Sequence, residues 1–234
     1  MQKTKIEWCD YTWNPVTGCL HNCPYCYARK VAKRFGKNYI GPDAIFTLDK
    51  RDGFYPFGFA PTFHRYCLNG PQFIKTPKNI FVCSMADLFG RWVPDEWILR
   101  VFSACAEAPQ HRYLFLTNNP SRYEKDIENI LPNDRFWFGT TVTNEKTSYY
   151  FSNSHNTFLS IEPIQSDFNK ALSLLFVNWV IVGAETGNRK GKVIPKREWI
   201  ENIVNRCREQ GIPVFLKSSL ASTWGEPLIQ EYPW

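Results

Sequence analysis

Three cysteines within eight residues constrain this chain more than any other feature. They are Cys19, Cys23 and Cys26, in the order Cys-x3-Cys-x2-Cys. The spacing lets one loop bring all three sulfurs to a single metal centre, and thiolates are the usual protein ligands of iron–sulfur clusters and of zinc. An ordinary ferredoxin-type cluster takes four thiolates, so three would leave one iron of a cubic cluster without a protein ligand. An iron with an open position can bind and activate another molecule, and the loop therefore predicts a reactive centre.

Two other interpretations of this loop are open on the residues alone. Cys23-Pro24-Tyr25-Cys26 is also the redox motif of glutaredoxin-like proteins. That interpretation leaves Cys19 unused and expects a chain far shorter than 234 residues. A zinc knot would take His21 as its fourth ligand, with ligands only two residues away on both sides, which is tighter than the usual zinc spacing. The cluster interpretation is favoured because it uses all three cysteines, unlike the redox motif, and does not need the tight ligand spacing that a zinc site with His21 would require.

Length, charge and cysteine usage bound the class of protein. A chain of 234 residues can form one large α/β domain, which we expect to span residues 1–234. The net charge of +6 is compatible with a nucleic-acid or other acidic partner without requiring one. The amino terminus lacks an apolar signal region, and no apolar stretch is long enough to span a bilayer. We therefore expect a cytoplasmic, reduced protein with no membrane partner, whose other cysteines are mostly small buried hydrophobes: Cys9, Cys67, Cys83, Cys105 and Cys207.

Apolar runs alternate with helical patterns from residue 78 onward. The runs predict strands over Asn79–Met85, Arg112–Thr117, Phe136–Val142, Thr157–Ile161, Trp179–Gly183 and Pro213–Leu216. Helices are predicted over Pro94–Ala108, Ser121–Ile130 and Glu198–Gln210, with a shorter turn from Phe168 through Phe176. Strands that alternate with helices are typical of a parallel α/β architecture. With a first strand inside residues 6–18, the pattern gives about seven β units.

Two segments precede this alternation. A helix is predicted from Tyr27 to Phe35, and it carries a basic face that is either solvated or forms a phosphate-facing rim beside the metal centre: Arg29, Lys30, Lys33, Arg34 and, beyond its end, Lys37. Residues 38–76 are irregular and rich in Gly, Pro and aromatic side chains. Long irregular insertions are usually functional or disordered, and aromatic content argues against disorder. We expect this insertion to be a packed lid or substrate loop.

Polar residues follow almost every predicted strand. In barrels built from such units, the chemistry sits at the carboxyl ends of the strands. Any one of these residues is more often a helix cap or a turn residue. Their repetition after successive strands favours a functional edge, and the residues that form it are Ser84, Asp87, Thr117, Asn118, Asn119, Thr141, Thr143, Asn144, Ser160, Glu162, Glu185, Thr186, Lys217 and Ser218.

The cysteine motif, with an aromatic residue before its last cysteine, closely resembles the signature of radical S-adenosylmethionine (radical SAM) enzymes. The resemblance extends over nearly the whole chain, to a phage- and prokaryote-associated branch of that superfamily that is distantly similar to spore photoproduct lyase. The segments that carry it are 6–15, 80–89, Ser160-Ile161-Glu162-Pro163 and 179–187. The chain departs from the branch at Asn118-Asn119, where we expect Lys-Arg, at Ala184 and Thr186, where we expect Gly and Ser, and after Lys217, where Gln-Trp-Gly is missing. These departures concern the substrate more than the cofactor.

The resemblance implies a fold and a cofactor chemistry. The fold would be a partial (β/α)6-type TIM barrel of the radical SAM kind, with one additional strand and the aromatic-rich insertion. Cys19, Cys23 and Cys26 would hold a 4Fe–4S cluster whose open iron chelates S-adenosylmethionine. Reductive cleavage would then give a 5′-deoxyadenosyl radical that abstracts hydrogen from the substrate, with a donor such as flavodoxin or ferredoxin supplying the electron.

The resemblance also implies roles for individual side chains. Tyr25 would lie beside the adenine, and Ser84 and Asp87 would bind the methionine amino group. Thr141, Thr143 and Asn144 suit hydrogen bonds to ribose or carboxylate. Glu162 or Glu185 would meet the ammonium or ribose of the cofactor, because a carboxylate near a cation is electrostatically favourable. Lys217 would complement a substrate anion, so Glu162 and Lys217 are the expected catalytic residues and Glu185 a cofactor contact.

The substrate is not identified by these residues. A nucleotide or nucleic acid is preferred over a peptide or small metabolite because of the net charge, the basic helix and the likeness to a DNA-repair lyase. The rival function is an iron–sulfur electron-transfer or regulatory protein without radical catalysis. A mere cluster carrier has no need of polar residues at the end of every strand, and these residues favour the enzyme.

Overall fold

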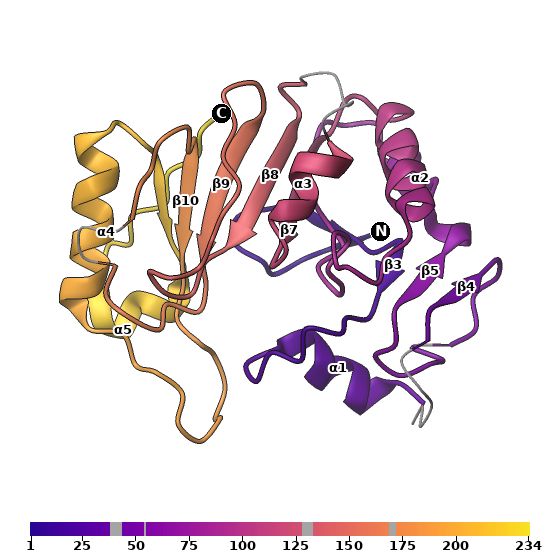
Figure 1. Cartoon of the computed structure of the whole chain (residues 1–234), viewed down its shortest axis with the longest axis horizontal. Helices are drawn as coiled ribbons and strands as arrows, with labels where there is room; N and C mark the ends of the chain where they lie inside the picture. The colour runs from indigo at the N-terminus through magenta and orange to yellow at the C-terminus, as the bar shows by residue number, and fades with distance from the viewer. Residues whose placement is uncertain (38–43, 54, 128–132, 169–171) are drawn as a thin grey trace. The chain divides into compact units, whose positions relative to one another are not determined.

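The computed structural model describes residues 1–37, 44–53, 55–127, 133–168 and 172–234, and the chain divides into two compact units (Figure 1). The first unit is Met1–Trp137 and the second is Phe138–Trp234.

A mostly parallel sheet forms the centre of the first unit. Its strand order is β1-β2-β6-β7, with bounds β1 (Gln2–Lys3), β2 (Tyr11–Trp13), β6 (Asn79–Val82) and β7 (Arg112–Thr117). Strands β2, β6 and β7 are parallel, and β1 pairs antiparallel with β2 at the edge. The helices that follow β6 and β7 are α2 (Asp95–Ala106) and α3 (Ser121–Asp126). The parallel α/β pattern predicted from the sequence is thus present.

Aromatic side chains dominate the core of this unit. Phe89 is fully buried and packs edge-on against Tyr123, with ring centroids 4.5 Å apart. From α2, Trp97 stacks on Phe63 at 5.1 Å, and Phe102 lies 4.9 Å from Phe115 on β7. Buried aromatic side chains contribute large apolar areas and favour offset or edge-to-face pairs of this kind. Many of the aromatic side chains of this unit therefore pack in its core.

A second, three-stranded sheet is built from the insertion. Its order is β3-β5-β4, with β3 (Val16–Thr17), β5 (Thr62–His64) and β4 (Phe46–Leu48). Two 3-10 turns follow, at η1 (Arg65–Cys67) and η2 (Gly70–Phe73), and α1 (Tyr27–Phe35) lies between β3 and β4. Residues 38–43 and 54 of the insertion lie outside the described residues. The insertion that we predicted to be a lid or substrate loop therefore contains two strands, β4 and β5. Strand β5 pairs with β3, which leads into the cysteine loop.

The second unit contains the remaining parallel strands. The order is β8-β9-β10-β11, with β8 (Phe136–Thr141), which begins in the first unit, β9 (Asn156–Ile161), β10 (Trp179–Val182) and β11 (Val214–Leu216). Strands β9, β10 and β11 are parallel. The connection between β10 and β11 carries α4 (Arg197–Glu209), and η3 (Ser218–Leu220) and α5 (Ala221–Trp224) follow β11.

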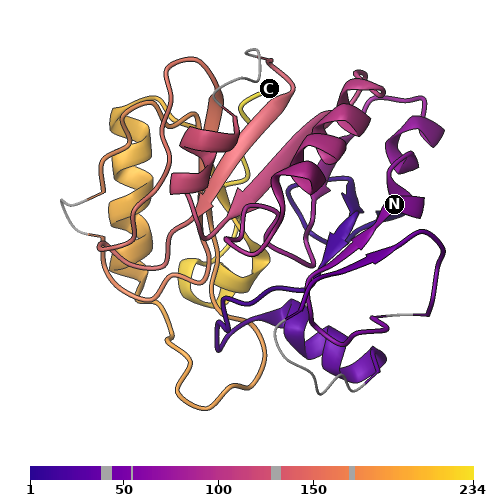
Figure 2. The same ribbon diagram turned by 45° about the vertical axis from the view of Figure 1, so that its right-hand side comes forward.

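Helix α4 covers one face of this sheet (Figures 1 and 2). Its buried residues are spaced i, i+3, i+4 and i+7, which places them on a single helical face: Ile200, Ile203, Val204 and Cys207. That face packs against aliphatic side chains of β9, β10 and β11, including Leu159, Val180 and Leu216. The helix ends at Glu209. Beyond its cap, Gly211 has a φ of +65°, which suits glycine, and Ile212 N–H donates to the Cys207 carbonyl at 2.8 Å.

The structure confirms a mixed α/β architecture with parallel strands, and most elements lie within a few residues of their predicted ranges. The α3 helix is shorter than predicted, and residues 128–130 of the predicted range are outside the described part. No helix is present at 172–176, and 169–171 are not described. Within the described residues the strands form no closed sheet, so the predicted partial barrel stays a prediction. None of the described helices has the length and apolar character needed to cross a membrane.

One glycine of the second unit is required by close packing. A Cβ atom added to Gly139 on β8 would overlap the ring of Phe158 on β9, which is fully buried. We expect Gly139→Ala to lower the free energy of unfolding by about 1–3 kcal/mol, because overpacking forces side chains and backbone to shift. Urea unfolding of the two proteins measures the difference. Combining it with Phe158→Leu should recover part of the loss, and strictly additive effects would contradict this account.

Candidate functional site

The cysteine loop starts at a position that only glycine fits. Gly18 has φ +85°, and a Cβ atom there would collide with the Ala60 carbonyl group. Gly18 N–H donates to the Met85 carbonyl at 2.9 Å, and Cys19 N–H donates to the Phe59 carbonyl at 3.2 Å. The backbone is therefore held between the end of β6 and the insertion just before the first cysteine.

All three cysteines of the loop are free thiols and partly buried. Cys26 caps α1, where its sulfur accepts the Arg29 N–H at 3.3 Å, and the Arg29 guanidinium donates to the Cys19 carbonyl at 2.9 Å. Across the described residues, no three His, Cys, Asp or Glu side chains are arranged to hold a single metal ion.

The pKa values of two thiols in the loop, Cys19 and Cys23, are raised. Burial raises the pKa of Cys19 to about 12, against a backbone hydrogen bond at His21 that lowers it; the nearby Asp87, Cys26 and Cys23 raise it further. Burial also raises the pKa of Cys23, although a hydrogen bond with Tyr25 opposes the shift. The mutual influence of the three sulfurs shows that they lie close enough to interact electrostatically. A bound cation would relieve this repulsion and draw the protons off, so metal binding should release protons.

The raised pKa of Cys19 predicts the reactivity of the metal-free protein. Because the thiolate is the nucleophile, we expect iodoacetamide at pH 8 to alkylate Cys19 roughly a hundredfold more slowly than a free cysteine peptide. The folded protein keeps this proton when the unfolded chain has lost it, so stability should fall as pH rises from about 9 to about 12. Peptide mass spectrometry after timed alkylation measures the rate, and labelling as fast as the peptide would contradict the burial of this thiol.

Asp87 joins the cysteine loop to the ends of two strands. The side chain is 3% exposed and follows β6. One of its oxygens lies 2.7 Å from His21 Nε2 and accepts the Asn118 N–H at 2.9 Å; the other accepts the Thr117 hydroxyl at 2.7 Å and the Phe89 N–H at 3.0 Å. The carboxylate that we predicted to bind the methionine amino group is thus occupied by protein donors.

Ser84 also lies at this strand end. Its hydroxyl donates to Asn14 Oδ1 at 3.2 Å, and the same oxygen accepts the Met85 N–H at 3.0 Å. The Ser84 carbonyl accepts the hydroxyl of Tyr27 at 2.6 Å, although Tyr27 is half exposed. Tyr25, Ser84 and Asp87 are therefore gathered around the cysteine loop within the first unit.

In the second unit, two predicted site residues meet across a glycine. Lys217 follows β11 and forms an ion pair with Glu162, which follows β9. Between them, Gly183 follows β10, and a Cβ atom there would lie 3.1 Å from both Glu162 Cδ and Lys217 Cδ. Both charged side chains keep some solvent exposure, at 28% for Glu162 and 17% for Lys217. The carboxyl ends of these parallel strands thus bring together a cation and an anion that remain accessible.

The other predicted residues of this unit have local partners. Glu185 is nearly buried, and its two oxygens accept from Arg189 Nε at 2.6 Å and Nη2 at 2.7 Å. Thr141 is buried at the end of β8. Thr143 accepts the Asn144 side-chain amide at 3.2 Å, and Asn144 in turn accepts the Lys146 N–H at 3.0 Å. Both hydrogen bonds of the Asn144 side chain are to near neighbours in the sequence, as is typical of a residue in a turn.

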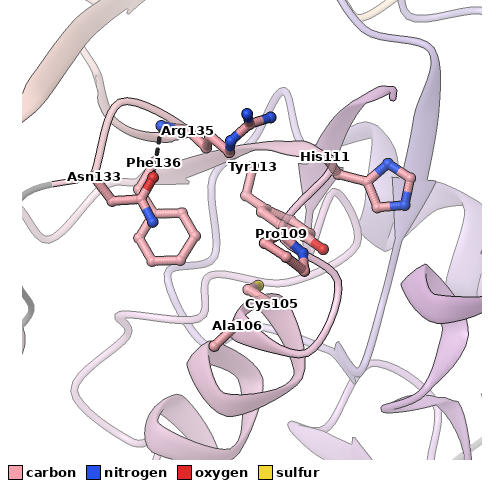
Figure 3. A pocket seen from close by; sticks show the side chains of 8 residues that line it. All are labelled: Cys105, Ala106, Pro109, His111, Tyr113, Asn133, Arg135 and Phe136. Atoms are coloured by element: carbon pink, nitrogen blue, oxygen red, sulfur yellow. Dashed lines mark hydrogen bonds between the residues drawn. The ribbon is translucent and has the colours of Figure 1, made fainter. Parts of the chain in front are cut away.

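A surface pocket of about 240 Å³ lies elsewhere in the first unit (Figure 3). Its lining is mostly apolar and includes none of the predicted site residues: Cys105, Ala106, Pro109, His111, Tyr113, Asn133, Arg135 and Phe136. In Figure 3 the Asn133 side chain accepts the Arg135 N–H, at 2.9 Å, and the His111 ring, fully buried, contacts the Pro71 carbonyl at 3.0 Å. These polar groups serve the local fold and leave the pocket without a convergent set of reactive groups.

Sequence reasoning missed three contributors to these clusters. His21 was considered only as a zinc ligand, but it contacts Asp87; Asn14 was treated only as the end of a strand; and Arg189, which pairs with Glu185, was not considered. The position of His21 between cysteines and the Asn-Pro step at 14–15 were visible signals. Nothing in the local sequence pointed to the partners of these side chains.

The family described as "Protein of unknown function (DUF5131)" matches residues 3–229. No curated protein matches the sequence. Among solved structures, a mutant of spore photoproduct lyase with dinucleoside spore photoproduct is similar, with a TM-score of 0.55 and 12% identity over 92% of this chain and 78% of that one. A spore photoproduct lyase mutant with bound AdoMet and dinucleoside spore photoproduct has a TM-score of 0.51 and 11% identity, over 86% of this chain and 74% of that one. At this identity the likeness concerns the fold.

Proposed function

We propose that this chain, which belongs to the DUF5131 family of unknown function, is a radical SAM enzyme. The observation that carries the proposal is the loop of three thiols, none in a disulfide, in the order Cys-x3-Cys-x2-Cys. The likeness of the fold to spore photoproduct lyase supports it, since one of those structures is described with bound AdoMet.

The donor set of the loop suits an iron–sulfur cluster. Cys19, Cys23 and Cys26 would hold a 4Fe–4S cluster, because three thiols share one short loop whose backbone is anchored at both ends. When bound, such a cluster supplies the one-electron reductive cleavage of S-adenosylmethionine to a 5′-deoxyadenosyl radical. The hydrogen bond between Asp87 and His21 would keep the loop in place, with Tyr25 beside it.

The remaining residues are proposed as contacts to the cofactor and substrate. Ser84, Thr141, Thr143, Asn144 and Glu185 are proposed cofactor contacts. Glu162 and Lys217, paired yet accessible, would orient a polar substrate and move a proton on it. We propose a nucleotide-containing substrate, because the similar lyase structures are described with a dinucleoside, and a donor such as flavodoxin or ferredoxin for the electron.

The first experiment tests the cofactor chemistry directly. The full chain is reconstituted anaerobically with iron and sulfide and reduced, and its EPR spectrum is recorded with and without S-adenosylmethionine while 5′-deoxyadenosine is assayed. A cluster signal that changes with S-adenosylmethionine, together with 5′-deoxyadenosine, is the expected result. A cluster indifferent to S-adenosylmethionine would instead indicate an electron-transfer or regulatory protein. Absence of a cluster would overturn the proposal and reopen the zinc and thiol-exchange interpretations.

A further inference from the structure

Helix α1 directly follows the cysteine loop (Figure 1), and one of its sides carries exposed positive charge. Lys30, Lys33 and Arg34 are all exposed, and their spacing of i, i+3 and i+4 places them on one side of the helix. The opposite side is held in the fold by the buried Ala28 and Ala32. We call these three cations the α1 stripe.

Among the residues that the structure describes, no carboxylate pairs with the α1 stripe. The helix has no acidic residue in its first turn and none anywhere in its sequence, and no described carboxylate forms an ion pair with the three cations. Lys37, beyond the helix, does have a distant partner in Asp52 at 3.7 Å, and we exclude it from the stripe. Unpaired like charges on adjacent turns destabilise a helix slightly, so their grouping favours an anionic partner.

The basic residues of α4 make the contrast clear. That helix interleaves arginine with glutamate, and two of its three arginines form ion pairs: Arg197 with Glu201 at 2.7 Å, and Arg208 with Glu231 at 2.7 Å. Most of the positive charge on α4 is thus compensated within the protein. The α1 stripe differs from α4 because its three cations have no ion pair among the described residues.

Two exposed aromatic rings mark the ends of the same helix. Tyr27 is 50% exposed at the first position and Phe35 is 59% exposed at the last, where the Arg34 guanidinium lies 5.2 Å from its ring. Exposed aromatic rings beside cations are the arrangement with which proteins stack bases while tracking a phosphate backbone. Lys30 follows Cys26 by four residues, about 6 Å along the helix axis. A strand bound along the stripe would pass next to the cysteine loop.

We propose that the α1 stripe binds the phosphate backbone of a single-stranded nucleic acid, and that the substrate is therefore a polymer rather than a free nucleotide. The inference rests on the proposed function only for the statement that this polymer is the substrate. Binding itself needs neither the cluster nor S-adenosylmethionine. A failure of radical chemistry and a failure of nucleic-acid binding can therefore be told apart.

The experiment measures binding of the metal-free full chain to a fluorescent single-stranded DNA of about 20 nucleotides by anisotropy, at several salt concentrations. The triple variant Lys30→Gln, Lys33→Gln, Arg34→Gln is compared with the wild type. The matched control is Lys3→Gln, Lys5→Gln, Lys75→Gln, which removes the same charge from exposed positions elsewhere in the first unit. Circular dichroism verifies that α1 and the fold are retained.

The wild type and the control should bind alike, with the dissociation constant rising steeply with salt. The α1 variant should bind at least about tenfold more weakly, and its slope of log K against log salt should be smaller by about 2, since each backbone phosphate contact contributes about 0.7. Equal losses in both variants would show a net-charge effect only and would overturn the proposal. So would absence of DNA binding by the wild type, or stronger binding to anionic lipid vesicles than to DNA.

Discussion

Replacing Cys19 with alanine is expected to abolish cluster binding and 5′-deoxyadenosine formation while leaving the fold intact. After reconstitution the wild type should hold about four irons per chain, and the variant only a small fraction of that. Removing a residue that only hydrogen-bonds to a metal ligand already lowers affinity or activity about 10–100-fold. Removing a ligand itself should therefore lower 5′-deoxyadenosine formation by roughly a hundredfold or more. Iron and sulfide analysis and the nucleoside assay measure the two effects.

The same variant separates the cluster interpretation from thiol exchange. A glutaredoxin-like activity would use Cys23 and Cys26 alone, so it would survive the change at Cys19 in a disulfide-reduction assay. The control is Cys9→Ala, since Cys9 is partly buried like Cys19 but lies outside the loop, with its sulfur 4.0 Å from the Ile6 carbonyl. Retention of full iron content by Cys19→Ala would contradict the assignment of this cysteine as a ligand.

Replacing Asp87 with alanine is expected to be the most destabilising single change at the candidate site. The substitution removes the carboxylate that contacts four polar groups. Three of these groups would lose this acceptor: the Thr117 hydroxyl and the N–H groups of Phe89 and Asn118. A buried polar group that loses its partner costs about 1–3 kcal/mol, so we expect the free energy of unfolding to fall by about 3–5 kcal/mol. Urea unfolding followed by tryptophan fluorescence measures the change.

A second variant distinguishes the fold from the placement of the cysteine loop. His21→Ala removes only one of the four contacts of Asp87, from a side chain that is 21% exposed, and should cost about 1 kcal/mol. Because His21 lies between two of the cysteines, this variant should nevertheless incorporate clearly less iron than the wild type, although most of its stability is kept. If Asp87→Ala unfolds within about 1 kcal/mol of the wild type, the carboxylate does not organise these strand ends as described.

The strands and helices of this protein were predictable because each depends on a pattern within its own segment. The strand at Arg112–Thr117 was predicted to the residue, since its apolar run is bounded on both sides by turn residues. Helix α1 was equally predictable from its helical pattern before Gly36. The small sheet made by β3, β5 and β4 was not, because short strands in an irregular insertion carry too little alternation to be recognised.

The candidate site likewise has features that the sequence predicts and features that only the tertiary structure reveals. Sequence by itself determined that three thiols share one loop, because eight residues of chain cannot place them far apart. It also placed Glu162 and Lys217 after strands, since strand ends follow from local patterning. Only the tertiary structure decided that these two, 55 residues apart, form an ion pair across Gly183, and that Asp87 serves the cysteine loop from 66 residues away. Such contacts depend on which strands become neighbours, and strand order is decided by the packing of the whole sheet.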